Sequence, residues 1–208
     1  MGARVTARRL PLLLLLLVLA MLLWSAIQPK DRFTWWLEVA PVLIALPLMI
    51  ATARRFPLTP LLYAAVAAHM IILMVGGHYT YAEMPLFNWL RDAFGLARNH
   101  YDRVGHLAQG FVPALAAREI LLRKTPLKPG AWLFVLVTCV CLAVSAAYEL
   151  IEWGVAEASG DEAVAFLATQ GDPWDTQKDM ALALLGSVLA QLALARLQDR
   201  QLARLVRS

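Results

Sequence analysis

Long apolar runs, separated by short polar segments, make up most of this chain. Six of them approach the roughly 20 residues that an α-helix needs to cross the hydrocarbon core of a bilayer. No segment alternates apolar and polar residues as a half-buried strand would, so the pattern predicts an all-α polytopic membrane bundle of about six transmembrane helices. The predicted spans are Leu10–Ile27, Trp36–Thr52, Leu58–Val75, Tyr101–Leu122, Ala131–Trp153 and Asp179–Leu197.

Two segments between these spans are too long to be simple turns, and each predicts a short helix on the outer face. In the first segment, Gly76–His100, Pro85 is well placed to begin a helix that lies in the membrane interface. In the second, Gly154–Lys178, Ser159 and Glu162 have the spacing of a capping box. The predicted apolar faces are Leu86, Trp89, Leu90, Ala93, Phe94 and Ala97 in the first helix and Ala163, Phe166 and Leu167 in the second, which ends at Gly171.

The composition excludes an ordinary soluble protein and a disordered chain. The 208 residues are 60% hydrophobic and only 16% charged, against about half and a quarter in soluble domains. We therefore expect one integral membrane domain over residues 1–208, with a first helix in 1–30 and a basic tail in 201–208. The first span also resembles a signal peptide, but Trp24-Ser25-Ala26 is a poor cleavage site and favours an uncleaved helix.

The basic residues predict the orientation of the bundle, because cytoplasmic loops carry an excess of lysine and arginine. With a cytoplasmic N-terminus, 13 of the 19 basic residues lie inside and both termini are cytoplasmic. The basic isoelectric point is then a topology signal and gives no reason to expect a nucleic-acid partner. The inside residues are Arg4, Arg8, Arg9, Arg54, Arg55, Arg118, Arg123, Lys124, Lys128, Arg196, Arg200, Arg204 and Arg207.

Charged side chains inside membrane helices are costly and usually functional. Here three pairs share helix faces at the outer ends of their spans, so we expect them to meet in one layer. They are Asp102 with His106, Glu149 with Glu152, and Asp175 with Asp179. The expected pocket also includes Gln109 on the face of Asp102 and His106, together with His78, Tyr79, His100, Asp172 and Trp174 from the outer loops.

Carboxylates and imidazole in one layer are suited to a divalent metal such as zinc, manganese or iron. The resulting hypothesis is a metal-assisted enzyme that acts on a lipid or envelope precursor. Its metal ligands would be Asp102, His106, Glu149 and Asp179, with Glu152 as the base and Asp175 as a further catalytic group.

Two other interpretations fit the same residues. The carboxylates of a proton-coupled transporter or channel would carry protons, but its polar residues should continue to the inner face. In a purely structural protein, Asp102 pairs with Arg103, Asp175 caps its helix, and Glu149 or Glu152 pairs with a nearby cation. The candidate cations for those glutamates are Arg91, Arg98 and Lys178.

Four polar segments also carry a family resemblance that covers roughly Val39–Leu197. They are Gly76–Tyr81, Asn99–His106, Tyr148–Trp153 and Gly171–Met180. In these segments the chain resembles the YjdF-type bacterial inner-membrane proteins, a family without a defined activity. The resemblance implies a multi-pass protein of the bacterial inner membrane, surrounded by membrane lipid.

A more distant similarity is to VanZ-like membrane proteins, which are linked to glycopeptide resistance. It rests on the helix start Asp102–His106, on Glu149, and on Asp179 followed by Gly186. The chain departs from that pattern at Ala183, where the VanZ-like pattern has an asparagine. This similarity implies a role at the cell envelope.

Overall fold

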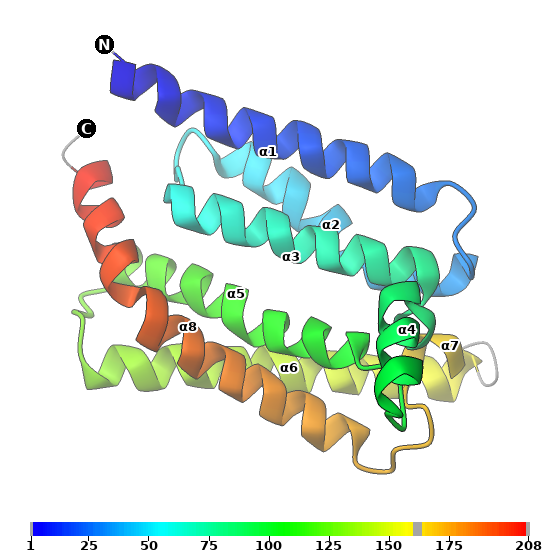
Figure 1. The fold of residues 1–208 in the computed structure, drawn as a ribbon. Coiled ribbons are helices and arrows are strands. Elements are labelled where there is room, and N and C mark those ends of the chain that lie inside the picture. Colours follow the sequence, from blue (N-terminus) through cyan, green and yellow to red (C-terminus); the bar gives the residue numbers. More distant parts are fainter. Residues whose placement is uncertain (1, 160–163, 207–208) are drawn as a thin grey trace.

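The structure is a computed structural model that describes residues 2–159 and 164–206. The described residues form helices and no strands, which confirms the all-α prediction (Figure 1). The elements are α1 (Gly2–Ala26), α2 (Arg32–Thr52), α3 (Pro60–Tyr79), a 3-10 turn η1 (Tyr81–Glu83), α4 (Pro85–Phe94), α5 (Tyr101–Lys124), α6 (Ala131–Ser159), α7 (Val164–Leu167) and α8 (Asp175–Val206).

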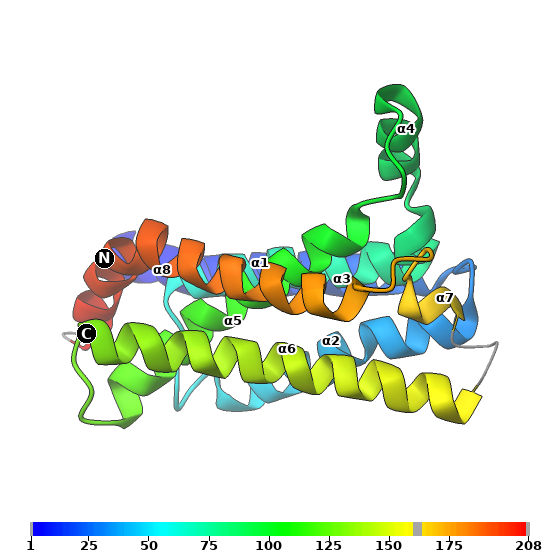
Figure 2. The same cartoon turned by 90° about the horizontal axis from the view of Figure 1, so that it is seen from below.

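The six long helices lie side by side along one axis, and both termini lie at the same end of the bundle (Figures 1 and 2). They form two groups of three. In the first group α1 and α2 both pack on α3, and in the second α5, α6 and α8 pack on one another. Contacts between α3 and α5 join the two groups.

Five helices are long and apolar enough to cross a membrane, namely α1, α2, α3, α6 and α8. The predicted fourth span, α5, has 24 residues, or about 36 Å at 1.5 Å per residue. Its charged residues make it more polar than the other five, but it runs the length of the bundle beside them (Figures 1 and 2). The charged residues of α5 are Asp102, Arg103, Arg118, Glu119, Arg123 and Lys124.

Helix α4 has the geometry expected of an interfacial helix. It runs across the bundle axis and projects from the side, at the end opposite the termini (Figure 2). None of its residues is buried, and Leu86, Trp89 and Phe94 are all more than half exposed. It begins at Pro85 as predicted and ends at Gly95, whose left-handed backbone caps it.

The second outer segment differs from its prediction in extent. Helix α7 has only four residues, in which Phe166 is buried. Glu162 of the proposed capping box, and Ala163, lie outside the described residues. The last span begins at Asp175, four residues earlier than expected, and continues to Val206 through most of the segment assigned to a tail.

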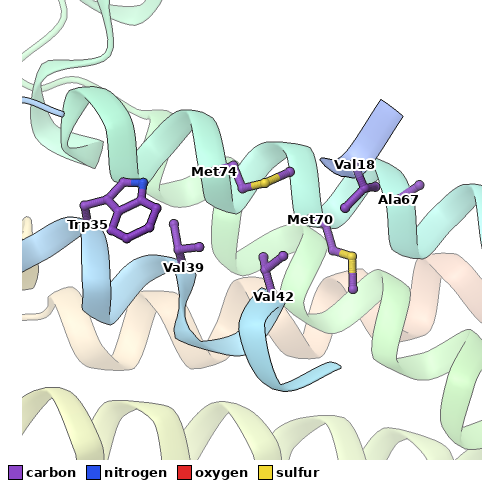
Figure 3. Packing of buried hydrophobic residues seen from close by; sticks show 7 residues of the cluster. All are labelled: Val18, Trp35, Val39, Val42, Ala67, Met70 and Met74. Atoms are coloured by element: carbon purple, nitrogen blue, oxygen red, sulfur yellow. The ribbon is translucent and has the colours of Figure 1, made fainter. Parts of the chain in front are cut away.

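Apolar side chains of α1, α2 and α3 fill the interior of the first group. Met70 and Met74 of α3 lie between Val39 and Val42 of α2 and Val18 of α1 (Figure 3). All five are less than 5% exposed. Unbranched methionine suits this irregular space because its side chain adapts to its neighbours.

Two glycines let α5 and α8 approach until their backbones touch. A Cβ atom at Gly110 would overlap the Ala183 carbonyl, and one at Gly186 would overlap the Leu107 carbonyl. Small residues at such contacts are typical of tightly packed membrane helices. This close contact places the N-terminal end of α8 directly against that of α5.

We expect Gly110→Ala to lower the thermal midpoint in detergent, because the added methyl group forces α5 and α8 apart. Overpacking of this kind costs about 1–3 kcal/mol. Gly154→Ala is the matched control, since a Cβ there meets nothing within 4 Å. A midpoint that falls equally in both variants would contradict the close approach.

The basic residues predict that both termini are cytoplasmic. A topology reporter fused after Ser208 should therefore read the cytoplasmic side, and one inserted between Ala156 and Thr169 the outer side. Two reporters on the same side would overturn the six-span topology.

Candidate functional site

The candidate site lies at the end of the bundle opposite the termini, where α5, α8 and α6 meet. Asp102 and His106 come from the first turns of α5 and Asp179 from the second turn of α8. All three are buried, and one ligand atom from each lies within 4.8 Å of the others. His106 Nε2 is 3.3 Å from Asp102 Oδ1 and 3.9 Å from Asp179 Oδ2.

An arginine holds the other oxygen of each aspartate. Arg98 donates to Asp102 Oδ2 at 3.3 Å, and Arg103 donates to Asp179 Oδ1. One oxygen of each carboxylate is thus fixed by a guanidinium group, while its second oxygen points toward His106. Outer partners of this kind orient metal-binding carboxylates in proteins.

Gln109 fixes the orientation of the His106 ring. Its amide oxygen lies 2.8 Å from His106 Nδ1 and can only accept, so Nδ1 carries the proton and donates. In the neutral ring, Nε2 then has a free lone pair directed at the two aspartates.

Glu149 is near this cluster but on the other edge of the ring. Its Oε1 lies 3.7 Å from His106 Nδ1 and has no hydrogen-bond partner among the described residues. It is not one of the three residues whose ligand atoms converge. The sequence predicted Glu149 as a ligand because its position along α6 is level with His106. Which edge of the imidazole ring it faces depends on how α6 packs against α5.

A ladder of ion pairs connects α5 to the start of α8. Arg103 contacts Asp172 at 3.1 Å and Asp175 at 2.6 Å, in addition to Asp179. Arg98 contacts the same Asp175 oxygen at 2.5 Å. At the solvent edge, a hydrogen bond from Lys178 lowers the pKa of Asp172.

This ladder contradicts the pairings expected of a purely structural cluster. Asp102 pairs with Arg98 rather than with Arg103, and Asp175 uses its carboxylate for two arginines rather than as a helix cap. It is Asp172 whose carboxylate binds the backbone just before α8, since its Oδ1 accepts from the Trp174 backbone N–H. Among the described residues, neither Glu149 nor Glu152 has an ion pair with lysine or arginine.

A cavity of about 320 Å³ opens beside the cluster, between α2, α3, α5 and α6. Asp102, His106 and Gln109 line it on one side and Glu152 on another. Glu38 of α2 also lines it; this carboxylate is 5% exposed, with Tyr81 and Tyr148 beside it. In the described part of the chain, no ion pair reaches Glu38.

Sequence reasoning missed Glu38. A signal was present, because Glu38 is the single acidic residue in the predicted span Trp36–Thr52. It had no partner at helical spacing, and α2 is distant in sequence from α5, α6 and α8.

Four residues expected in the pocket lie outside the cluster and do not line the cavity. His78 Nδ1 donates to the Ser25 carbonyl, 3.2 Å away, and its ring packs on Trp24, which Tyr79 also contacts edge-on. Trp174 is 63% exposed, and His100 is the residue before α5, with no side-chain capping bond.

Negative charge exceeds positive charge inside this end of the bundle. Glu38, Asp102, Glu149, Asp175 and Asp179 are each less than 9% exposed, and their main cationic partners are the guanidinium groups of Arg98 and Arg103. If all five carboxylates are ionised, three negative charges remain. Buried charge of this size requires a further cation or bound protons.

The opposite end of the bundle holds a second buried polar cluster whose charges are matched. Glu119 accepts from Thr59 and Arg123, and Arg118 pairs with Asp199 at 2.8 Å. Between the two clusters α5 contributes Ala114 and Leu115 to an apolar cluster with Val137 of α6, and α8 contributes the buried polar residues Ser187 and Gln191. The matched cluster needs no ligand to account for it.

Comparison with known proteins places the chain in a family. Residues 10–200 match the family described as "Predicted membrane protein (DUF2238)". The chain belongs to this family of membrane proteins. It is also 53% identical over 183 residues to "Inner membrane protein YjdF" of Escherichia coli (strain K12), and the match covers 88% of each protein.

No solved structure matches this chain. With its several apolar helices, the chain is a multi-pass protein of the bacterial inner membrane. The resemblance to YjdF-type proteins is thereby confirmed, whereas the similarity to VanZ-like proteins stays a prediction.

We expect Arg103→Gln to destabilise the protein by about 3–5 kcal/mol, the usual cost of leaving buried carboxylates without their partner. Thermal unfolding in detergent measures this. Lys178→Gln removes an exposed partner of Asp172 from the same ladder and should change the midpoint little. Equal midpoints for the two variants would show that Arg103 does not hold α5 against α8.

Proposed function

We propose that this protein is a metal-dependent enzyme of the inner membrane that acts on a lipid or envelope precursor. A divalent metal such as zinc, manganese or iron would be bound by Asp102, His106 and Asp179. The convergence of these three side chains, within 4.8 Å and buried, is the observation that carries the proposal.

The geometry of the three groups supports a metal. Two ligands that bind zinc at about 2.0–2.1 Å in tetrahedral geometry lie about 3.3 Å apart. The distances of 3.3 and 3.9 Å from His106 Nε2 to the aspartate oxygens are close to that value. Three protein ligands with one open position are typical of catalytic zinc sites, whereas structural sites usually have four.

The charge of the site supports the same conclusion. A divalent cation would reduce the excess of three negative charges to one. It would bind at His106 Nε2, the ring nitrogen that the Gln109 hydrogen bond leaves free. In this proposal Asp175 is a positioning residue, because it holds the two arginines that orient Asp102 and Asp179.

The surroundings of the site support a lipid-derived substrate. The cavity that Asp102 and His106 line has largely apolar walls, and Val144, one of its lining residues, is 44% exposed. Glu152 lines the same cavity and is the proposed general base. The metal would polarise an oxygen of the substrate or activate a water molecule.

A proton-coupled transporter or channel is the alternative, and the apolar side chains that α3, α5 and α6 contribute between the two polar clusters argue against it. On α8 the buried polar residues between Asp179 and Gln198 are Ser187 and Gln191, which do not titrate. Beyond these residues the charges of Arg118 and Glu119 are already matched.

Metal analysis of the purified protein tests the proposal. Wild-type protein supplied with zinc, manganese or iron and then dialysed should retain about one equivalent of one of them. Asp179→Asn should lose it, because an amide oxygen is a weaker ligand than a carboxylate. The matched control is Asp92→Asn, an exposed position on α4 whose partner is Arg91.

Glu149→Gln distinguishes a site of three ligands, Asp102, His106 and Asp179, from a site in which Glu149 is a fourth ligand. It should retain the metal, because Glu149 lies on the other edge of the imidazole ring. Loss of metal with an unchanged thermal midpoint would instead make Glu149 a fourth ligand. Wild-type protein that retains no metal under any of the three conditions would refute the proposal.

A further inference from the structure

The cavity beside the candidate site has one acidic end and one apolar end. Glu38, Asp102 and Glu152 line the acidic end, together with the rings of Tyr81 and Tyr148. No lysine or arginine is present among the described residues that line the cavity. The remaining walls are largely apolar and include Pro41, Ala45, Val66, Met70, Val112 and Val144.

The apolar end of the cavity shares two lining residues with a second space in the first helix group. Val66 and Met70 of α3 line both this cavity and a second one of about 260 Å³ between α1, α2 and α3. The second cavity is lined almost entirely by hydrocarbon side chains, and Figure 3 shows Met70 within this group.

We propose that this cavity binds a single-chain amphiphile whose head group is a positively charged amine. The ammonium group would lie at Glu38, and the hydrocarbon chain would follow Val66 and Met70. The cavity volume of about 320 Å³ is in the range typical of small-molecule sites.

Charge complementarity selects the ammonium head group. Glu38 is buried without a cation within ion-pair distance, and Glu152 faces the same space. An anionic head group would be repelled by these carboxylates, and a neutral one would leave their charge to be balanced by bound protons alone. An ammonium group forms charge-assisted hydrogen bonds to carboxylates, and Tyr81 and Tyr148 line the same space.

This binding does not depend on the proposed metal. Glu38 lies on α2 and is not one of the converging ligands Asp102, His106 and Asp179. Experiments in the presence of a chelator therefore test the amphiphile alone. Binding of the amine by a protein that binds no metal would support this inference and refute the proposed function.

The test compares three probes with the same chain: dodecylamine, 1-dodecanol and dodecanoate. The full-length protein is held in an uncharged maltoside detergent at neutral pH with a chelator. Binding is followed by the thermal midpoint and by the mass of the intact complex. Dodecylamine should bind and raise the midpoint, and the other two probes should bind at least tenfold more weakly.

Two variants and one control locate the site. Glu38→Gln keeps the shape of the side chain and should weaken dodecylamine binding about tenfold or more. Val144→Trp narrows the opening at a half-exposed position and should also weaken it, with an unchanged midpoint in the absence of probe. Asp92→Asn removes one negative charge from exposed α4 and should bind as wild type does.

Equal binding of dodecanol or dodecanoate would overturn the proposal, as would wild-type affinity in Glu38→Gln. If Glu38→Gln does not fold, Val144→Trp decides the result. Wild-type affinity for dodecylamine in that variant would place the amine elsewhere and overturn the assignment.

Discussion

Arg103 is the residue on which the arrangement of the bundle end opposite the termini depends. It reaches from α5 to three aspartates at the start of α8, Asp172, Asp175 and Asp179. Such a link is strong inside a membrane protein, because each separated charge would be buried without a partner. It holds α8 against α5 at the level where Asp179 meets His106.

The close contact of the two helix backbones makes this link possible. Gly110 and Gly186 allow α5 and α8 to touch in the middle of the bundle, so their outer ends lie within reach of one arginine side chain. Arg103 and Arg98 then fix one oxygen of each aspartate, and the second oxygen is directed at the His106 ring. Packing in the apolar part of the bundle thus sets the chemistry of the polar part.

The two polar clusters of the bundle illustrate different uses of buried charge. Around Glu119 each carboxylate has a donor or a cation, and the cluster joins α3, α5 and α8. Around His106 the carboxylates outnumber their partners, and three of them, Glu38, Asp102 and Glu152, line a cavity. A matched network contributes to structure, whereas unmatched buried charge beside open space is typical of a site that receives a ligand.

The sequence alone determined the helices and the contacts within each of them. Hydrophobic length identified the spans, and helical spacing placed Asp102 beside His106, because both depend only on neighbours along the chain. Tertiary packing decided the rest. It set Arg98 rather than Arg103 beside Asp102, and it turned His78 toward Trp24. It also placed Glu149 at the far edge of the imidazole and brought Glu38 into the cavity. These outcomes depend on the rotation of each helix about its axis and on its choice of neighbours, which are fixed by contacts between residues far apart in the sequence.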